Sequence, residues 1–222
     1  MVEEDETRPV EIHVGEATLQ GDLGVPKGAR GLVVFAHGSG SSRLSPRNRF
    51  VASVMREGGL ATLLFDLLTE DEERIDLRTR ELRFDIGLLG RRLVGAIDWI
   101  GRESAIDGLA IGTFGSSTGA AAALIAAAQR PDSVRAVVSR GGRPDLAMEV
   151  LDRVRAPTLL IVGARDQAVI PLNEKALAAL RCEKKLELIP GATHLFEESG
   201  TLEQVAALAR DWFVQHLGQS SS

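Results

Sequence analysis

The chain has 222 residues, of which 44% are hydrophobic and 26% charged, and its formal net charge is −5 at pH 7. This size predicts one domain over residues 1–222, with flexible tails at 1–9 and 219–222. The mild acidity argues against a nucleic-acid-binding surface, which needs clustered basic residues. No apolar run reaches 18 residues, so no membrane span is expected.

The cysteine content and the first residues bear on location. Cys182 is the only cysteine, so an internal disulfide is ruled out and a reducing compartment is compatible with the composition. Residues 1–6 are mostly acidic and lack the basic start and apolar stretch of a secretory signal. A cytoplasmic location is therefore expected.

Apolar patterns along the chain predict a series of strands. Alternating apolar and polar residues over 10–14 and 17–23 predict an antiparallel hairpin at a sheet edge. Continuous apolar runs are typical of strands that are covered on both faces. They predict buried strands at 31–36, 60–65, 109–114, 134–139 and 156–162, with a last strand at 186–189.

Helical patterns separate these strands. Ser45 is predicted to cap a helix that begins at Pro46 and buries Phe50 and Met55. The acidic run 70–73 is predicted to be a solvated loop, and one long amphipathic helix is predicted over 77–101. Further helices are predicted over the alanine-rich 120–128 and from 171 to about 180, with a short helical piece between the loop 140–144 and about residue 153. The last helix is predicted to begin at Thr201, where Gln204 completes a capping box.

This order of elements predicts an α/β fold. A mostly parallel central sheet is expected, with an N-terminal antiparallel hairpin and helices on both faces. In such sheets the functional groups gather at the carboxyl ends of the strands. Candidate catalytic residues are therefore sought just after each predicted strand.

The segment 115–119, with the sequence GSSTG, joins a predicted strand to the alanine-rich helix. A serine with glycine two residues before and two after, in this setting, matches the nucleophile elbow Gly-x-Ser-x-Gly. Glycine and serine also crowd ordinary turns, so the pentapeptide alone is a weak signal. Its strand-then-helix setting favours Ser117 as a nucleophile.

Two further strand ends supply partners for Ser117. Asp166 follows the strand 156–162, and His194 follows the last strand. An imidazole can take and return the serine proton near neutral pH, and a carboxylate fixes the tautomer of the ring. His194 is the histidine expected to reach Ser117, whereas His37 is expected to be structural. Asp66 is the substitute if Asp166 does not serve.

The negative charge of a tetrahedral intermediate needs hydrogen-bond donors. The backbone amide of Thr118, at the start of a helix, is the first expected donor. The second is expected from the loop 37–40, with Ser39 as the first choice and Gly40 as the second. Loss of one such donor costs about 3 kcal/mol of transition-state stabilisation.

From about residue 10 to 218 the chain resembles the α/β-hydrolase superfamily, nearest to its dienelactone hydrolase-like branch. The resemblance is carried by the segments 37–40 (HGSG), 115–119 (GSSTG), 163–166 (GARD) and 192–194 (ATH). It implies a hydrolase that uses Ser117, His194 and Asp166 without a metal or an organic cofactor. Dienelactone hydrolase proper carries a cysteine nucleophile, so dienelactone itself is not the expected substrate. The short connection after 134–139 predicts an open site without a cap domain.

These residues predict a serine hydrolase that cleaves small carboxylic esters, lactones or thioesters through an acyl-enzyme. Acyl transfer on the same triad is one alternative, and a non-catalytic binding module on the same fold is another. Arg43 and Arg140 follow strand ends on the catalytic side and are candidates for binding a substrate carboxylate or phosphate. Ion pairs with local acids such as Asp66 are the alternative role for both. The oligomeric state does not follow from the sequence.

Overall fold

The computed structural model describes residues 7–218. The expected tails 1–6 and 219–222 lie outside the described residues. Residues 7–9, which were predicted to belong to a flexible tail, instead form the start of the first strand, β1 (Thr7–Val14). They are held there by antiparallel pairing, which joins Thr7 to Gly24 of the second strand, β2 (Ala17–Gly24).

One eight-stranded sheet forms the centre of the described chain, with the order β1-β2-β4-β3-β5-β6-β7-β8. The strands β1, β2 and β4 pair antiparallel, and all other pairs are parallel. The remaining strands are β3 (Leu32–Ala36), β4 (Ala61–Phe65), β5 (Ile111–Ser116), β6 (Val134–Arg140), β7 (Thr158–Gly163) and β8 (Lys184–Ile189). The predicted α/β sheet and its N-terminal hairpin are thus confirmed.

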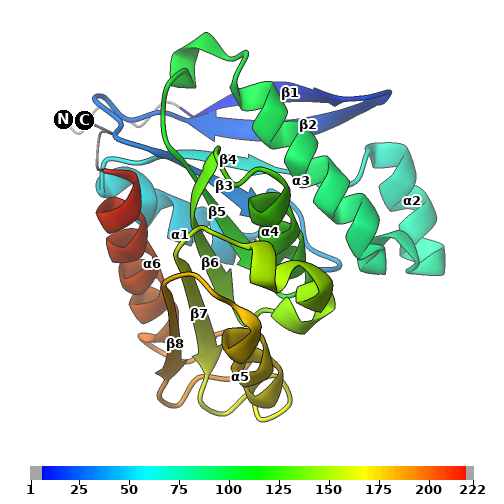
Figure 1. Ribbon diagram of the computed structural model, residues 1–222. Helices are drawn as coiled ribbons and strands as arrows, with labels where there is room; N and C mark the ends of the chain where they lie inside the picture. Colours follow the sequence, from blue (N-terminus) through cyan, green and yellow to red (C-terminus); the bar gives the residue numbers. More distant parts are fainter. Residues whose placement is uncertain (1–6, 219–222) are drawn as a thin grey trace.

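Helices cover both faces of the sheet (Figure 1). One face packs against α1 (Pro46–Glu57) and α6 (Thr201–Leu217), with Phe35, Phe114 and Phe213 in the shared core. The other face carries α3 (Ile86–Ile100), α4 (Thr118–Gln129), the 3₁₀ segment η3 (Pro144–Arg153) and α5 (Ile170–Ala179). Strands β3 to β7 are buried on both faces, which explains their continuous apolar runs.

The region 70–101 differs from the prediction of an acidic loop followed by one long helix. The acidic run opens a helix, α2 (Glu70–Thr79), because Thr69 and Glu72 form a capping box at its start. Acidic side chains in a first turn also complement the helix dipole. A left-handed residue, Arg80, ends α2, and Asp85 caps α3 after the short turn η1 (Leu82–Phe84).

Two local predictions were wrong at helix surfaces. Thr201 does not form a capping box with Gln204, because Gly200 is the N-cap and the Thr201 hydroxyl donates to the Glu198 carbonyl at 2.6 Å. Phe50 was expected on the buried face of α1, yet it is 37% exposed. Asn48 occupies a buried position of α1 instead, where its amide oxygen accepts from the Ser116 hydroxyl.

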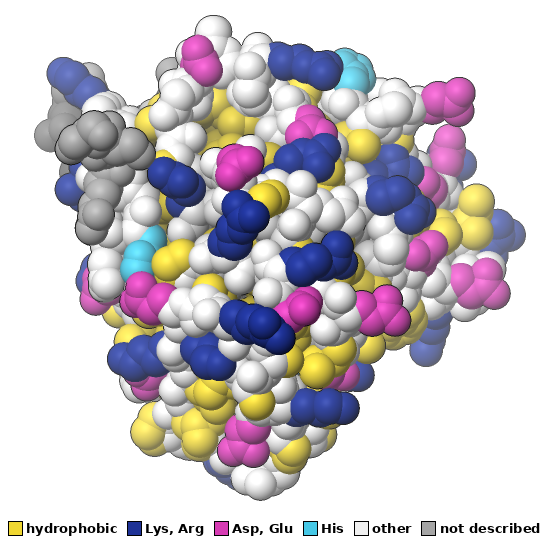
Figure 2. Space-filling model, in the orientation of Figure 1, with side chains coloured by type: hydrophobic (Ala, Val, Ile, Leu, Met, Phe, Trp, Pro, Cys, Tyr) yellow, Lys and Arg dark blue, Asp and Glu magenta, His cyan; other side chains and the backbone are white. Residues whose placement is uncertain are grey.

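One face of the molecule mixes charges of both signs. Figure 2 shows Lys and Arg side chains interspersed with Asp and Glu over the visible face, without a basic stripe on that face. Within residues 7–218, no helix is both long and apolar enough to cross a bilayer.

Candidate active site

The turn between β5 and α4 holds Ser117 in a strained conformation. Its backbone has φ 51° and ψ −122°, a region that side-chain-bearing residues rarely occupy. The turn ends the strand at Ser116 and starts the helix at Thr118, so Ser117 stands alone at the apex. Strain of this kind persists only where the surrounding structure enforces it, and it is typical of functional residues.

The two glycines of the elbow allow the strand and the helix to approach closely. A Cβ on Gly119 would lie 2.1 Å from the Ala36 carbonyl oxygen, and one on Gly115 would lie 2.4 Å from the Ala120 Cα. Both obstacles are backbone atoms, which cannot move aside as a flexible side chain can. The glycines two before and two after Ser117 are therefore steric requirements of the turn.

His194 and Asp166 meet across the ends of β8 and β7. The His194 Nδ1 lies 2.6 Å from an oxygen of Asp166, so Nδ1–H donates and Nε2 is left to accept a proton. The Asp166 side chain is 10% exposed and that of His194 is 40% exposed. The carboxylate is thus enclosed, while the ring reaches the surface of the pocket.

The loop that carries His194 is tied down by Glu198. The Glu198 carboxylate accepts from the Thr193 amide at 3.1 Å and from the Thr193 hydroxyl at 2.6 Å. These hydrogen bonds, led by the hydroxyl, lower the pKa of Glu198 below its ordinary value. Sequence reasoning missed this tether, because the only signal is an acid five residues after a threonine.

Ser117 and His194 line one pocket of about 610 Å³. Among the described residues the Ser117 hydroxyl has no hydrogen bond to the ring. Such bonds are often loose without substrate and tighten in the complex. A neighbouring pocket of about 730 Å³ shares Ser41, Ser42 and Glu73 with the first but contains neither Ser117 nor His194. The chemistry therefore favours the smaller pocket as the candidate site.

The loop 37–40 packs directly against the elbow. A Cβ on Gly38 would lie 3.0 Å from the Ser117 Cβ, so this glycine too allows a close approach. The Ser39 amide donates to the Thr118 hydroxyl at 3.1 Å, and the two hydroxyls lie 2.8 Å apart. Ser39 and Gly40 are the two expected oxyanion donors from this loop, and the amide of Ser39 is hydrogen-bonded to Thr118 of the elbow. Gly40, with φ 69°, forms the next turn of the loop.

His37 is buried and hydrogen-bonded on both ring nitrogens. Its Nδ1 lies 3.0 Å from the Gly38 carbonyl, and its Nε2 accepts from the Leu67 amide at 3.1 Å. A ring that donates at Nδ1 and accepts at Nε2 is neutral. Burial lowers the pKa of His37, against the opposing effects of the Gly38 carbonyl and of Asp66 and Glu73. The ring connects the loop 37–40 to Leu67 in the segment that follows β4, as expected of a structural histidine.

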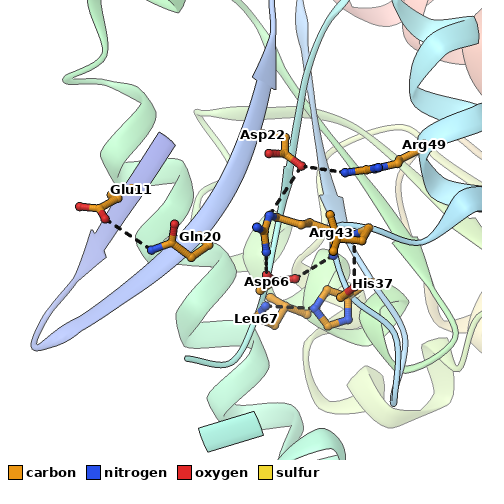
Figure 3. A network of polar contacts seen from close by, with 10 residues as sticks. Glu11, Gln20, Asp22, His37, Arg43, Arg49, Asp66 and Leu67 are labelled. Carbon is orange, nitrogen blue, oxygen red and sulfur yellow. Dashed lines mark hydrogen bonds and ion pairs between the residues drawn. The ribbon is translucent and has the colours of Figure 1, made fainter. Parts of the chain in front are cut away.

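Arg43, one of the two candidate anion-binding residues, is engaged by acids (Figure 3). Its guanidinium pairs with Asp66 and lies 3.6 Å from an oxygen of Asp22, and its amide donates to Asp66 at 2.7 Å. Asp66, the substitute for Asp166, is thereby occupied. Arg43 is not part of the lining of the pocket that contains Ser117.

Arg140, the other candidate, lies inside that pocket. It is 8% exposed and shares the lining with Ser117, His194 and Arg47. Sequence reasoning did not single out Arg47, because it lies in the first turn of α1 and does not directly follow a strand. Residues 7–218 contain no group of three or more His, Cys, Asp or Glu side chains arranged to hold a metal ion.

The sheet order, the strained turn after β5 and the residues at the ends of β7 and β8 define an α/β-hydrolase fold. The family model of the dienelactone hydrolase family matches residues 20–217. The chain therefore belongs to the dienelactone hydrolase family, and its fold and family support a hydrolase.

Solved structures agree with this assignment. A crystal structure of a dienelactone hydrolase from Anabaena variabilis is 60% identical, with a TM-score of 0.94 over 96% of this chain and 98% of that one. The ferulic acid complex of Est1E from Butyrivibrio proteoclasticus has a TM-score of 0.80 over 95% of this chain and 100% of that one. At 17% identity it shows the fold alone.

A curated relative is longer than this chain. A Mycobacterium tuberculosis protein whose name describes a phosphoribosyl transferase is 57% identical over 208 residues. The match covers 94% of this chain but 46% of the relative, so the chain spans about half the length of that protein.

Proposed function

We propose that the protein hydrolyses carboxylic esters, lactones or thioesters of small molecules, with Ser117 as nucleophile, His194 as base and Asp166 as the carboxylate that orients it. The observation that carries the proposal is the 2.6 Å contact between His194 and Asp166 beside a serine held at φ 51°. Either feature alone occurs in proteins without catalysis. Ser117 and His194 line the same pocket, and this combination supports nucleophilic catalysis.

The proposed reaction proceeds in two halves. In the first, the Ser117 oxygen attacks the acyl carbon as its proton moves to the Nε2 of His194. The bond from the acyl carbon to the leaving oxygen or sulfur then breaks, and the proton passes to that atom, which departs as an alcohol or thiol. In the second, His194 takes a proton from water, the hydroxide attacks the acyl carbon, and the proton returns to Ser117 as the acid leaves. The Asp166 carboxylate stabilises the imidazolium that forms in each half.

The oxyanion is proposed to bind backbone amides. The Thr118 amide opens a 12-residue helix, where the first N–H groups lack acceptors within the helix. The Ser39 amide is proposed as the second donor. This amide already donates to the Thr118 hydroxyl, so its N–H would either bind the hydroxyl and the oxyanion together or leave the hydroxyl when the oxyanion forms. Gly40 remains the alternative donor from the same loop.

Hydrolysis is favoured over the transferase activity in the name of the M. tuberculosis relative. That name belongs to a protein of which this chain matches 46%, whereas the family model covers residues 20–217 of this chain. Water has access to the proposed site, because the His194 side chain is 40% exposed. The proposal also includes action in the cytoplasm as a single domain.

A substrate panel tests the proposed function. Wild-type protein is expected to cleave at least one of a set of 4-nitrophenyl esters, simple lactones and acyl thioesters, and Ser117→Ala is expected to lower kcat at least about 1,000-fold. The matched control is Ser53→Ala on α1, where the hydroxyl donates to the Phe50 carbonyl of the same helix and does not line the pocket. Turnover retained in Ser117→Ala would refute the assignment of the nucleophile.

A further inference from the structure

Arg140 is anchored beside the proposed nucleophile. It ends β6, and its backbone pairs with Ser116 of β5 on one side and Ile161 of β7 on the other. Its carbonyl accepts from the Ser117 amide at 3.3 Å. The strand that carries Arg140 thus lies between the strand that ends at the elbow and the strand that precedes Asp166.

Two nitrogens of the Arg140 guanidinium are buried without a hydrogen-bond partner among the described residues. Its Nε and Nη1 are enclosed and have no hydrogen bond within the described part of the chain. Its contact is with the ring of Phe196, whose centroid lies 6.0 Å away. Leaving a charge uncompensated in the interior costs several kcal/mol. Packing alone therefore does not account for an arginine at this position.

Other arginines of the chain show what a structural role requires. Arg43 pairs with Asp66, Arg83 with Asp76, and Arg130 with Asp98. In the Asp98–Arg130 pair, Nε and Nη2 of the arginine each donate to a carboxylate oxygen at 2.7 Å. Arg140 departs from this pattern, although it is better buried than Arg130.

The surroundings of Arg140 add positive charge. Arg47 lines the same pocket, and its Nε is also enclosed without a partner, while its Nη1 contacts Glu197 at 3.1 Å. Burial, and then the charge of Arg47, lowers the pKa of Arg140 to about 10, so the guanidinium is still charged at neutral pH. Among the residues that the structure describes, the one acid in the lining is Glu73, which comes from α2.

We infer that Arg140, with Arg47 beside it, binds an anionic group of the substrate while the scissile carbonyl reaches Ser117. The inference rests on the proposed hydrolase function and narrows its substrates to esters, lactones or thioesters with a carboxylate or phosphate near the scissile bond. Guanidinium N–H groups suit both anions. The substrate anion supplies the partner that the protein lacks, and thereby offsets the cost of burying Arg140.

Matched ester pairs test this inference. In the first pair the charge is on the acyl side: 4-nitrophenyl adipate, with a free carboxylate, is compared with its methyl ester. In the second pair the charge is on the leaving group: 4-acetoxybenzoate is compared with its methyl ester. A phosphate in place of the carboxylate is tested with 4-acetoxyphenyl phosphate. Arg140→Met is expected to lower kcat/KM for at least one anionic member by about 10- to 100-fold, since hydrogen bonds to charged groups are worth about 1.5–3 kcal/mol. The neutral members should change less than about threefold. Arg130→Met, which removes a paired surface arginine, is the matched control.

Two further measurements separate binding from folding and from catalysis. Arg140→Met should keep or raise Tm, because it removes an uncompensated buried charge and retains an unbranched side chain. In Ser117→Ala, 4-acetoxybenzoate or 4-acetoxyphenyl phosphate should raise Tm through binding to the folded state, and the added Arg140→Met should abolish that shift.

The outcomes are distinct. Equal effects of Arg140→Met on charged and neutral esters, or a large fall in Tm, would overturn the inference and leave the hydrolase function standing. Failure of wild type to cleave any ester, with the anion-dependent Tm shift still present, would refute the hydrolase function but support the anion site. Absence of both the shift and any preference for charged esters would overturn the inference.

Discussion

His194→Ala is expected to lower kcat/KM for a 4-nitrophenyl ester by about 10³- to 10⁶-fold, the range that loss of a general base produces in serine hydrolases. Without the ring, the described lining of the pocket holds no other histidine to take the proton of Ser117, and a neutral hydroxyl is a poor nucleophile. The fold should persist, because the His194 side chain is 40% exposed and its hydrogen bond is to Asp166. Steady-state kinetics and a thermal melt provide the two measurements.

The matched control for this variant is His13→Ala. His13 lies on the edge strand β1, where its ring hydrogen-bonds the Thr18 side chain at 3.2 Å. Its removal should leave kcat/KM within about threefold of wild type, since surface changes away from a site have small effects. If His194→Ala retained full turnover, Ser117 would have another base, and the assignment would be wrong.

Gly119→Ala is expected to destabilise the protein by about 3 kcal/mol or more, as overpacking against backbone does in its severe cases. The added methyl would lie 2.1 Å from the Ala36 carbonyl and 2.5 Å from that of His37, so α4 and β3 must separate. For a chain of this size the expected fall in Tm is at least about 6 °C. Activity should fall as well, because the same displacement moves Ser117 and the loop that carries Ser39.

Gly101→Ala is the matched control for the elbow glycine. Gly101 caps α3 with φ −63°, a conformation that alanine adopts freely, and its added Cβ would meet only the Asp98 carbonyl at 3.8 Å. This change should be neutral or slightly stabilising. Equal melting temperatures for the two variants would contradict the steric role assigned to Gly119.

The fold could be predicted because its strands differ in the way they are buried. Strands β3 and β7 are covered on both faces and therefore show continuous apolar runs, whereas β1 alternates at the sheet edge. The region 70–85 could not be predicted in the same way. Its outcome depended on a capping box at Thr69 and on the buried Asp76, whose carboxylate accepts from the amide of Arg83 at 3.1 Å. Neither has a periodic signature.

The candidate site was predictable where strand ends mark it. Ser117, Asp166 and His194 each follow a strand, so the topology brings them to one edge of the sheet. Pairing between side chains was not predictable, because it depends on packing between distant segments. Arg43 and Arg140 both follow predicted strand ends, yet within the described residues Arg43 lies between two acids and Arg140 pairs with none.

The most direct test of the proposed chemistry is mass spectrometry of the protein after treatment with a fluorophosphonate probe. We expect one adduct per chain, mapped to the peptide that contains Ser117, absent in Ser117→Ala and much slower to form in His194→Ala. An adduct at another residue, or no adduct in a protein that still cleaves esters, would contradict a catalytic serine at the elbow.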